Sequence, residues 1–491
     1  MGEELQSADQ RPRRTFTYAM WAALVAAFLG WMFDGLEMGL YSIAVPAALA
    51  DLCQTSDPKV ISALLSLTLG LFLLGMSAGG IIFGRLGDRI GRVRALIFTV
   101  LIYAVFTGLS GLSRTWQELA LFRFLGAVGL GGEWGLGVAL VMETWPNASR
   151  PVLAGVLGAA ANFGFLASSG IGFLRAQYDW SWRIVLISGA LPAVLTVFVR
   201  LCVREPERWR RARERGEIAP FFAGERSSKL LGLSIGAAIA LGYWLVNRIN
   251  LLNSAPQLLG EGNVAVQAAL LTMYMVVGGL VGAMAGAGGL WGPELRRRTF
   301  LGAALAAIAV LGLWGSLQAW LQAWVRDVTP PELVKDAVAR TTMWMSLGAI
   351  VGSLLGGPIG EWLGRRVSFA LLCLASMGLA LVLYTTCTPY PMNARFLALV
   401  CLVFIPTIAF FGWLPLYLPE LFPTRLRTTG EGFTFNAARV VSAYGIFGTP
   451  ALIKLFGGSY PRAAATMSLI YAVGLIVIWF CPELKGKELP D

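Results

Sequence analysis

Long apolar runs alternate with short polar segments along almost the whole chain. Residues 18–30, 60–83 and 463–481 contain no Asp, Glu, Lys or Arg. About 18 consecutive apolar residues are enough to cross a bilayer as a helix. Within lipid, a helix satisfies all of its own backbone hydrogen bonds, whereas an open strand does not. The pattern therefore predicts an all-α membrane protein.

We expect fourteen membrane-spanning helices. If the N-terminus is cytoplasmic, the loops that fall on its side of the membrane contain most of the Lys and Arg residues, as the positive-inside rule requires. This asymmetry predicts that both termini are cytoplasmic and that the protein lies in the inner membrane of a bacterium. The predicted spans are residues 18–46, 60–83, 95–112, 118–142, 152–174, 182–202, 230–254, 264–290, 299–324, 341–360, 367–386, 395–417, 429–453 and 463–481.

Two loop motifs occur twice. Residues 84–92 read GRLGDRIGR, and residues 357–366 repeat the pattern as GPIGEWLGRR. Residues 143–150 read ETWPNASR, and residues 420–427 read ELFPTRLR. The two pairs are separated by nearly the same number of residues, and all four segments fall on the cytoplasmic side. A parallel repeat of this kind predicts a substrate site between the halves, near the middle of the membrane.

These motifs resemble the major facilitator superfamily. Residues 84–92 are similar to its G-x-L-x-D-R-x-G-R motif, and 357–366 form a weaker second copy. The GGEW at 131–134 and the segment 419–430 are similar to the metabolite:proton symporter branch. The resemblance implies two six-helix bundles around a central cavity, alternating access, and charged loops that close the cytoplasmic side. The gating residues expected from it are Gly84, Asp88, Arg89, Gly91, Arg92, Glu143, Arg150, Glu361, Arg365, Glu420 and Arg427.

The fourteen predicted helices are two more than the twelve of the major facilitator fold. We assign the two additional helices to a hairpin inserted between the bundles, where glycines allow close helix packing. Facilitators with fourteen helices occur among drug exporters, which keeps that alternative open. The expected organisation is a first bundle at 1–203, a basic linker at 204–229, the hairpin at 230–290 and a second bundle at 291–491.

Three carboxylates lie inside apolar runs. Asp34 and Glu37 are three residues apart and share a helix face, and Glu133 lies near the middle of the fourth span. A carboxylate at such a depth costs about 2.5–3.5 kcal/mol on insertion scales, so a function is the default hypothesis. We predict that these three residues couple transport to protons. The alternative is a structural ion pair with an intramembrane arginine.

Buried arginines and polar side chains are candidates for substrate binding. Arg123 and Arg439 could each bind a carboxylate through two parallel hydrogen bonds. Asn436 shares a helix face with Arg439. Both arginines could instead pair with acids of the protein. Further candidates to line the cavity are Asn162, Gln318, Tyr417, Trp314, Trp344, Trp413 and Tyr444.

Composition narrows the function to transport. The 39 Lys and Arg residues exceed the 28 Asp and Glu residues, which the positive-inside rule explains without nucleic acid. The chain has no histidine, and its six cysteines form no C-x-x-C pair, so we expect no metal, no cofactor and no enzyme. We predict a monomer whose partners are lipids, protons and a small anion. The expected function is proton symport of a small organic anion, and the alternatives are a proton-driven exporter and a transporter-like sensor.

Overall fold

The computed structural model describes residues 17–218, 233, 241, 292–447 and 455–490, and these residues are largely helical. The N-terminal half begins with five long helices, continues with one broken helix and ends with a short basic helix. These are α1 (Tyr18–Leu52), α2 (Pro58–Ile90), α3 (Arg92–Ser110), α4 (Trp116–Thr144), α5 (Arg150–Tyr178), the broken pair α6 (Trp182–Ser188) and α7 (Ala193–Cys202), and α8 (Glu207–Glu214).

The C-terminal half has the same plan. Its first helix passes through one π-helical turn, η3 (Trp314–Gln318), and its last helix is again divided. The helices are α11 (Pro293–Leu313), α12 (Ala319–Val328), α13 (Val334–Leu363), α14 (Arg365–Thr386), α15 (Ala394–Leu421), α16 (Arg427–Phe447), α18 (Tyr460–Ser468) and α19 (Ile470–Val477).

Eleven helical stretches within the described residues are long and apolar enough to cross a membrane. Each predicted span outside 230–290 coincides with an observed helix, and α16 occupies the place of the predicted span 429–453. Several observed helices are longer than predicted, because polar residues continue the helix beyond its apolar centre. The sixth span is broken at 189–192, next to Pro192, whose nitrogen carries no hydrogen for a helix. The predicted hairpin at 230–290 lies outside the described residues, so the number of fourteen helices stays a prediction.

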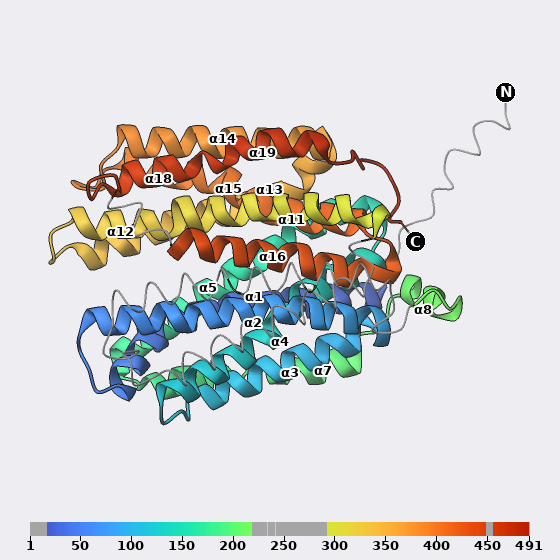
Figure 1. The fold of residues 1–491 in the computed structure, drawn as a ribbon, viewed down its shortest axis with the longest axis horizontal. Coiled ribbons are helices and arrows are strands. Elements are labelled where there is room, and N and C mark those ends of the chain that lie inside the picture. The colour runs from blue at the N-terminus through green and yellow to red at the C-terminus, as the bar shows by residue number, and fades with distance from the viewer. Residues whose placement is uncertain (1–16, 219–232, 234–240, 242–291, 448–454, 491) are drawn as a thin grey trace, which may run out of the picture.

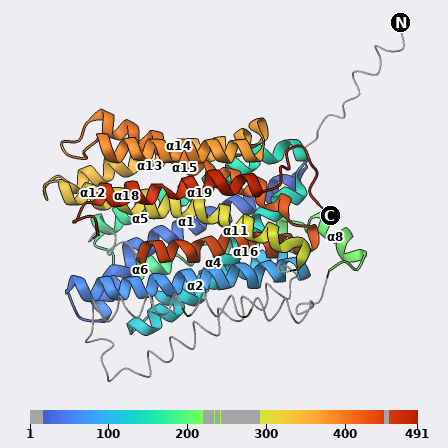
Figure 2. The ribbon, with the colours of Figure 1, turned by 45° about the horizontal axis from the view of Figure 1, so that its top comes forward.

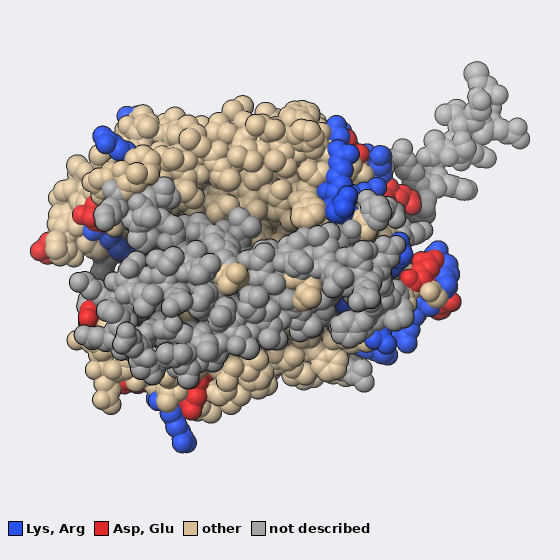
Figure 3. All heavy atoms as spheres, in the orientation of Figure 1, with Lys and Arg blue, Asp and Glu red and all other residues tan. Residues whose placement is uncertain are grey.

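The two halves form two layers of roughly parallel helices (Figure 1). Rotating the view leaves α8 and the C-terminal residues at the same end of the bundle (Figure 2). Lys and Arg side chains gather at this end, and the described surface between the two ends shows almost no charge in this view (Figure 3). We call the end that carries α8 and the starts of α3 and α14 the basic end. An apolar flank between charged ends is what a multi-pass membrane protein requires.

The repeated glycines allow the halves to approach each other. Helix α16 packs on α2, and α13 packs on α5. A Cβ atom on Gly84 would meet the carbonyl oxygen of Thr428, and one on Gly357 would meet the carbonyl oxygen of Pro151. The first glycine of each motif copy therefore lies where one half touches the backbone of the other.

A glycine substitution tests the packing inside the N-terminal half. The place of a Cβ atom on Gly131 of α4 is taken by the backbone carbonyl of Met76 on α2. Gly131→Ala is therefore expected to destabilise the protein by about 1–3 kcal/mol, because α2 and α4 must separate. Gly170→Ala is the matched control, since nothing lies within 4 Å of its Cβ position. Thermal unfolding in detergent measures both, and equal midpoints would contradict the packing.

Candidate functional site

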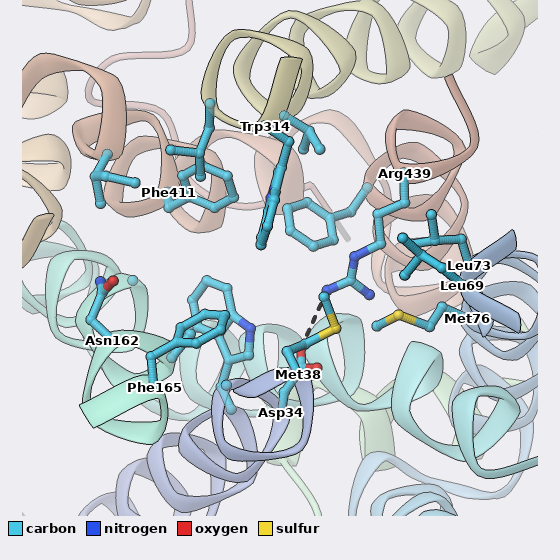
Figure 4. A pocket seen from close by; sticks show the side chains of 18 residues that line it. Asp34, Met38, Leu69, Leu73, Met76, Asn162, Phe165, Trp314, Phe411 and Arg439 are labelled. Atoms are coloured by element: carbon cyan, nitrogen blue, oxygen red, sulfur yellow. Dashed lines mark hydrogen bonds and ion pairs between the residues drawn. The ribbon is translucent and has the colours of Figure 1, made fainter. Parts of the chain in front are cut away.

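A cavity of about 970 Å³, counting its part open to solvent, lies between the two halves. Its walls come from α1, α2 and α5 on one side and from α11, η3, α15 and α16 on the other. Most of its side chains are apolar, and the charged residues among them are Asp34 and Arg439 (Figure 4). This is the position at which transporters with repeated halves hold their substrate.

Asp34 and Arg439 form an ion pair across the cavity. Arg439 Nη2 donates to Asp34 Oδ2 at 3.2 Å and links α16 to α1. Arg439 Nη1 donates to Asn436 Oδ1 at 3.0 Å, and the guanidinium lies 4.9 Å from the centre of the Phe435 ring. Asn436 is itself held by the carbonyl oxygen of Gly131. Within the described residues, the second oxygen of Asp34 has no hydrogen-bond partner.

Glu133 lies close to this pair. It is only 3% exposed, and neither of its carboxylate oxygens has a hydrogen-bond partner in the described part of the chain. The side chain lies against Gly30 of α1, where a Cβ atom would overlap Glu133 Oε1. Gly30 is about one helical turn from Asp34. The structure thus brings Asp34, Glu133 and Arg439 together at the centre of the molecule.

Arg123 and Glu37 do not line the cavity. They form an ion pair with each other inside the N-terminal half, and Thr107 donates a hydrogen bond of 3.0 Å to Glu37. The Arg123 guanidinium lies 5.1 Å from the ring centre of Tyr41 and 5.0 Å from that of Phe72. A buried arginine needs a nearby carboxylate to offset its lost hydration. Paired in this way, neither residue is part of the cavity wall, where we expected Arg123 to bind the substrate.

Two of the other expected lining residues reach the cavity. Asn162 of α5 and Trp314 of η3 form part of its wall (Figure 4). Asn162 Nδ2 also approaches Ser353 Oγ of α13 at 3.4 Å, which is a contact between the halves. These two residues lie on opposite sides of the cavity.

The remaining expected residues lie elsewhere. Gln318 is half-buried at the end of η3 and is not part of the cavity wall. Tyr417 donates to the carbonyl oxygen of Pro482 at 2.9 Å, and Trp413 donates to Ser368 Oγ at 2.9 Å inside the C-terminal half. Trp344 packs against the C-terminal core. The side chain of Tyr444 lies outside the described residues.

A second polar site, which we call the end cluster, joins the halves at the basic end and consists of Asp88, Arg92, Glu143 and Arg427. Arg92 makes a bidentate interaction with Glu143, in which Nε donates at 3.1 Å and Nη2 at 2.9 Å. Arg427 of α16 donates to Glu143 Oε1 at 2.7 Å. One carboxylate is therefore shared by an arginine from each half.

Asp88 adds a second link between the halves. It accepts hydrogen bonds from the backbone N–H groups of Thr428 at 3.2 Å and Thr429 at 3.0 Å. The hydroxyl groups of both threonines donate to it as well. These groups form the N-terminus of α16, where the helix dipole favours an anion.

The second copy of the motif repeats the arginine site within the C-terminal half. Arg365 makes a bidentate interaction with Glu420, in which Nε donates at 3.0 Å and Nη2 at 2.7 Å. Its Nη1 also donates to Glu361 at 2.9 Å. A counterpart of the Asp88 link is absent among the described residues, because Pro151 in the first turn of α5 has no N–H to donate. Of the other expected gating residues, Arg150 is buried at the same end and Arg89 is exposed.

Sequence reasoning missed two glutamates that cap helices. Glu205 accepts the N–H groups of Val93 and Arg94 at the start of α3. Glu483 accepts those of Arg365 and Arg366 at the start of α14, at 2.9 and 3.0 Å. Each helix follows a glycine with positive φ, +115° at position 91 and +87° at position 364, which suits a residue without Cβ. The internal repeat could have indicated these two glutamates, because each follows the last membrane helix of its half.

The two capping glutamates differ in the direction in which the structure shifts their pKa. Burial raises the pKa of Glu205, and its hydrogen bonds from backbone N–H groups lower it only part of the way. Burial opposes the charge of Glu483 too, but there the backbone N–H groups prevail and hold the pKa below its usual range. An acid with a lowered pKa stabilises the fold above its unfolded pKa and loses that contribution as the pH falls through its folded pKa.

Glu483→Gln is therefore expected to lower the thermal unfolding midpoint at about pH 7, where the wild-type carboxylate is charged in both states. The two proteins are expected to converge as the pH falls through the folded-state pKa of Glu483, because the carboxyl then takes up a proton in the native protein. Glu488→Gln, at an exposed position nearby, serves as the control. A difference that persists unchanged at the acid pH would show that the cap does not act through its charge.

The comparisons with known proteins agree with this architecture. A family model described as "Sugar (and other) transporter" matches residues 22–229 and 368–491. A metabolite transport protein of Haemophilus influenzae is 26% identical over 96% of this chain and 98% of its own length. The sialic acid transporter NanX of Escherichia coli is 21% identical over 95% of this chain and 94% of its own.

A solved structure shows the same fold. The proton:xylose symporter XylE superposes with a TM-score of 0.69 at 16% identity, covering 96% of this chain and 98% of that chain. Two repeated helical halves, a cavity between them and the matched family model lead to one conclusion. The chain belongs to the sugar (and other) transporter family, so it is a transporter and not an enzyme, and its fold is that of the major facilitator symporter XylE.

Proposed function

We propose that the protein is a proton-coupled symporter that imports a small organic anion by alternating access. The observation that carries the proposal is the Asp34–Arg439 ion pair, at 3.2 Å, in the wall of the central cavity. The pair connects the two halves, which must move against each other in alternating access. It also combines a proton acceptor with an anion-binding group.

The pair couples the two ligands by competition. While Asp34 is ionised, it occupies Nη2 of Arg439. When Asp34 takes a proton, its charge disappears and this arm of the guanidinium becomes free for a substrate carboxylate. Asn436 keeps the other arm in place. A charge-assisted bond to the substrate then replaces the internal pair, so that substrate binds together with a proton.

Glu133 is a second proton acceptor in this proposal. Its carboxyl is buried beside Gly30 without a partner among the described residues. An unpaired carboxylate is strongly disfavoured in such a place, so the group holds a proton in this conformation. Arg123 and Glu37 support the N-terminal half structurally, since each neutralises the other.

The cavity favours a small acid with an apolar part. Apart from Asp34, Arg439 and Asn162, its wall is formed mainly by apolar and aromatic side chains. Pockets of this kind bind through apolar contacts, and a few polar groups orient the ligand. The name of the relative NanX gives sialic acid, a carboxylic acid, as its substrate, in agreement with an arginine in the cavity.

The basic end faces the cytoplasm in this proposal, in accordance with the positive-inside rule. Both termini are then cytoplasmic, in a bacterial inner membrane. The organisation remains two six-helix bundles at 1–203 and 291–491, with the linker 204–229 and a transmembrane hairpin at 230–290 between them. The end cluster is the cytoplasmic gate, and it is closed here because Arg427 and Asp88 hold the halves together.

Asp88→Asn is expected to weaken the gate by about 1–3 kcal/mol, because the charge that faces the N-terminus of α16 is lost. We would place a cysteine at Ser77, which bonds to the backbone of Asn436 between the halves, in a background without other cysteines. A membrane-impermeant thiol reagent on the basic-end side should react about tenfold faster in the variant. Asp327→Asn, at an exposed site, is the control, and equal rates in all three proteins would count against the gate.

Proteoliposomes with an internal pH dye test the function. Monocarboxylates, dicarboxylates, sialic acid, neutral sugars and cationic drugs are added one at a time, and empty liposomes correct for passive entry of protonated acids. Acidification with one of the acids would support symport and identify the substrate class. A response to the cations alone would indicate an exporter, and binding without flux would indicate a sensor.

A further inference from the structure

Glu431 is a buried acid that neither the central site nor the end cluster uses. It lies in the second turn of α16, four residues after Arg427, and its exposed fraction is 0%. Neither of its carboxylate oxygens has a hydrogen-bond partner in the described ranges. Eight residues separate it from Arg439, which corresponds to about 12 Å along the helix. It is therefore distinct from the central proton site.

The groups that act on Glu431 electrostatically are those of the end cluster. Arg427 on its own helix and Arg92 at the start of α3 favour its charge, whereas Glu143 on α4 and Asp88 on α2 oppose it. From α11, Arg298 donates to the carbonyl oxygen of Leu421 at 3.4 Å. From α15, Glu420 is bound to Arg365.

The two arginines of the end cluster are already occupied. Arg92 donates to Glu143 and to the carbonyl oxygens of Gly87 and Thr424. Arg427 donates to Glu143 and to the backbone of Pro419 and Pro490. In the closed arrangement neither arginine offers Glu431 a hydrogen bond. A buried carboxylate without a partner is costly, whereas the protonated acid is not charged.

We propose that Glu431 holds a proton while the basic end is closed and gives it up when that end opens. Opening separates Arg427 from Glu143 and admits water. The O–H bond of the Glu431 carboxyl then breaks, the proton passes to a water molecule, and the carboxylate pairs with the released Arg427. Closing reverses each step, so the closed state binds one more proton than the open state.

This proton links the gate to pH on the basic-end side. Because the closed state binds the additional proton, the ratio of open to closed molecules rises with pH, by at most about tenfold per pH unit. The inference deepens the proposed proton-coupled cycle and rests on it for its role in transport. The linkage itself is measurable without substrate or flux.

Electron–electron distance measurements between two spin labels test the proposal. The labels replace Arg94, an exposed residue at the start of α3, and Trp362, which is 77% exposed at the end of α13, in a background without native cysteines. These positions lie at the basic end of opposite halves. In the otherwise unchanged protein, the long-distance population should grow between about pH 6 and about pH 8. In Glu431→Gln, which imitates the protonated acid, the short distance should persist throughout.

A matched variant makes the result specific. Glu214→Gln, at an exposed site on α8, should keep the full pH response. The proposal is overturned if the unsubstituted protein shows no pH response, or if Glu431→Gln responds like it. Failure of the liposome assay alone would reject symport and leave this distance measurement standing.

Discussion

Asp34→Asn is expected to abolish accumulation of substrate driven by a proton gradient while leaving exchange of substrate across the membrane intact. The asparagine side chain cannot take up a proton, yet it removes the charge that occupies Arg439 Nη2 at 3.2 Å. The anion site is then always free, and substrate crosses without a proton. A one-to-one symporter concentrates its substrate by up to about tenfold per pH unit of gradient, and the variant should reach equal concentrations only. Radiolabelled uptake and counterflow in proteoliposomes measure the two activities separately.

The control for this variant is Asp327→Asn, which removes an exposed carboxylate far from the cavity and should change neither activity. Full gradient-driven accumulation by Asp34→Asn would remove Asp34 from the coupling mechanism. Loss of accumulation together with loss of exchange, in a protein that still folds, would instead make Asp34 a part of the substrate site only.

Arg439→Lys is expected to weaken substrate binding by about 10- to 100-fold, corresponding to about 1.5–3 kcal/mol for a lost charge-assisted hydrogen bond. Lysine keeps the positive charge, but its single ammonium group cannot bridge Asn436 and a carboxylate in the way the planar guanidinium does. Isothermal calorimetry with the acid identified in the liposome panel measures the dissociation constant.

Arg123→Lys is the comparison, because Arg123 is also an arginine inside a helix bundle but is paired with Glu37 away from the cavity. It should reduce thermal stability and leave the dissociation constant within about twofold of wild type. If the two lysine variants weaken binding alike, Arg439 is not the anion site, since a general loss of packing would then explain both.

The spans and the repeat follow from the sequence because lipid imposes a simple rule on it. Charged residues inside an apolar run are also conspicuous, which is why Asp34, Glu133 and Arg439 could be predicted as site residues from the chain alone. Their partners could not be predicted. Arg123 and Arg439 both lie inside apolar runs, so the sequence does not distinguish them. The packing of α4 against α1 pairs Arg123 with Glu37, and Asp34 then pairs with Arg439.

The residues missed by the sequence analysis lie near helix ends. Glu431, Glu205 and Glu483 each stand beside basic, polar segments, where a glutamate usually faces water. Glu431 is buried because the N-terminal half covers the first turns of α16, and that contact joins residues more than 300 positions apart, as in the bond from Thr428 to Asp88. Tertiary contacts of this length leave no local pattern in the sequence.

The dissociation constant of the substrate as a function of pH tests the central claim most directly, with an acid that stays ionised over the whole range. If a proton on Asp34 must accompany the anion on Arg439, affinity should fall by about tenfold per pH unit above the range in which Asp34 is protonated. In Asp34→Asn the pH dependence should vanish, and the affinity should stay at its acid-side value. An affinity that is independent of pH in the wild type, or a slope that survives in Asp34→Asn, would contradict the account.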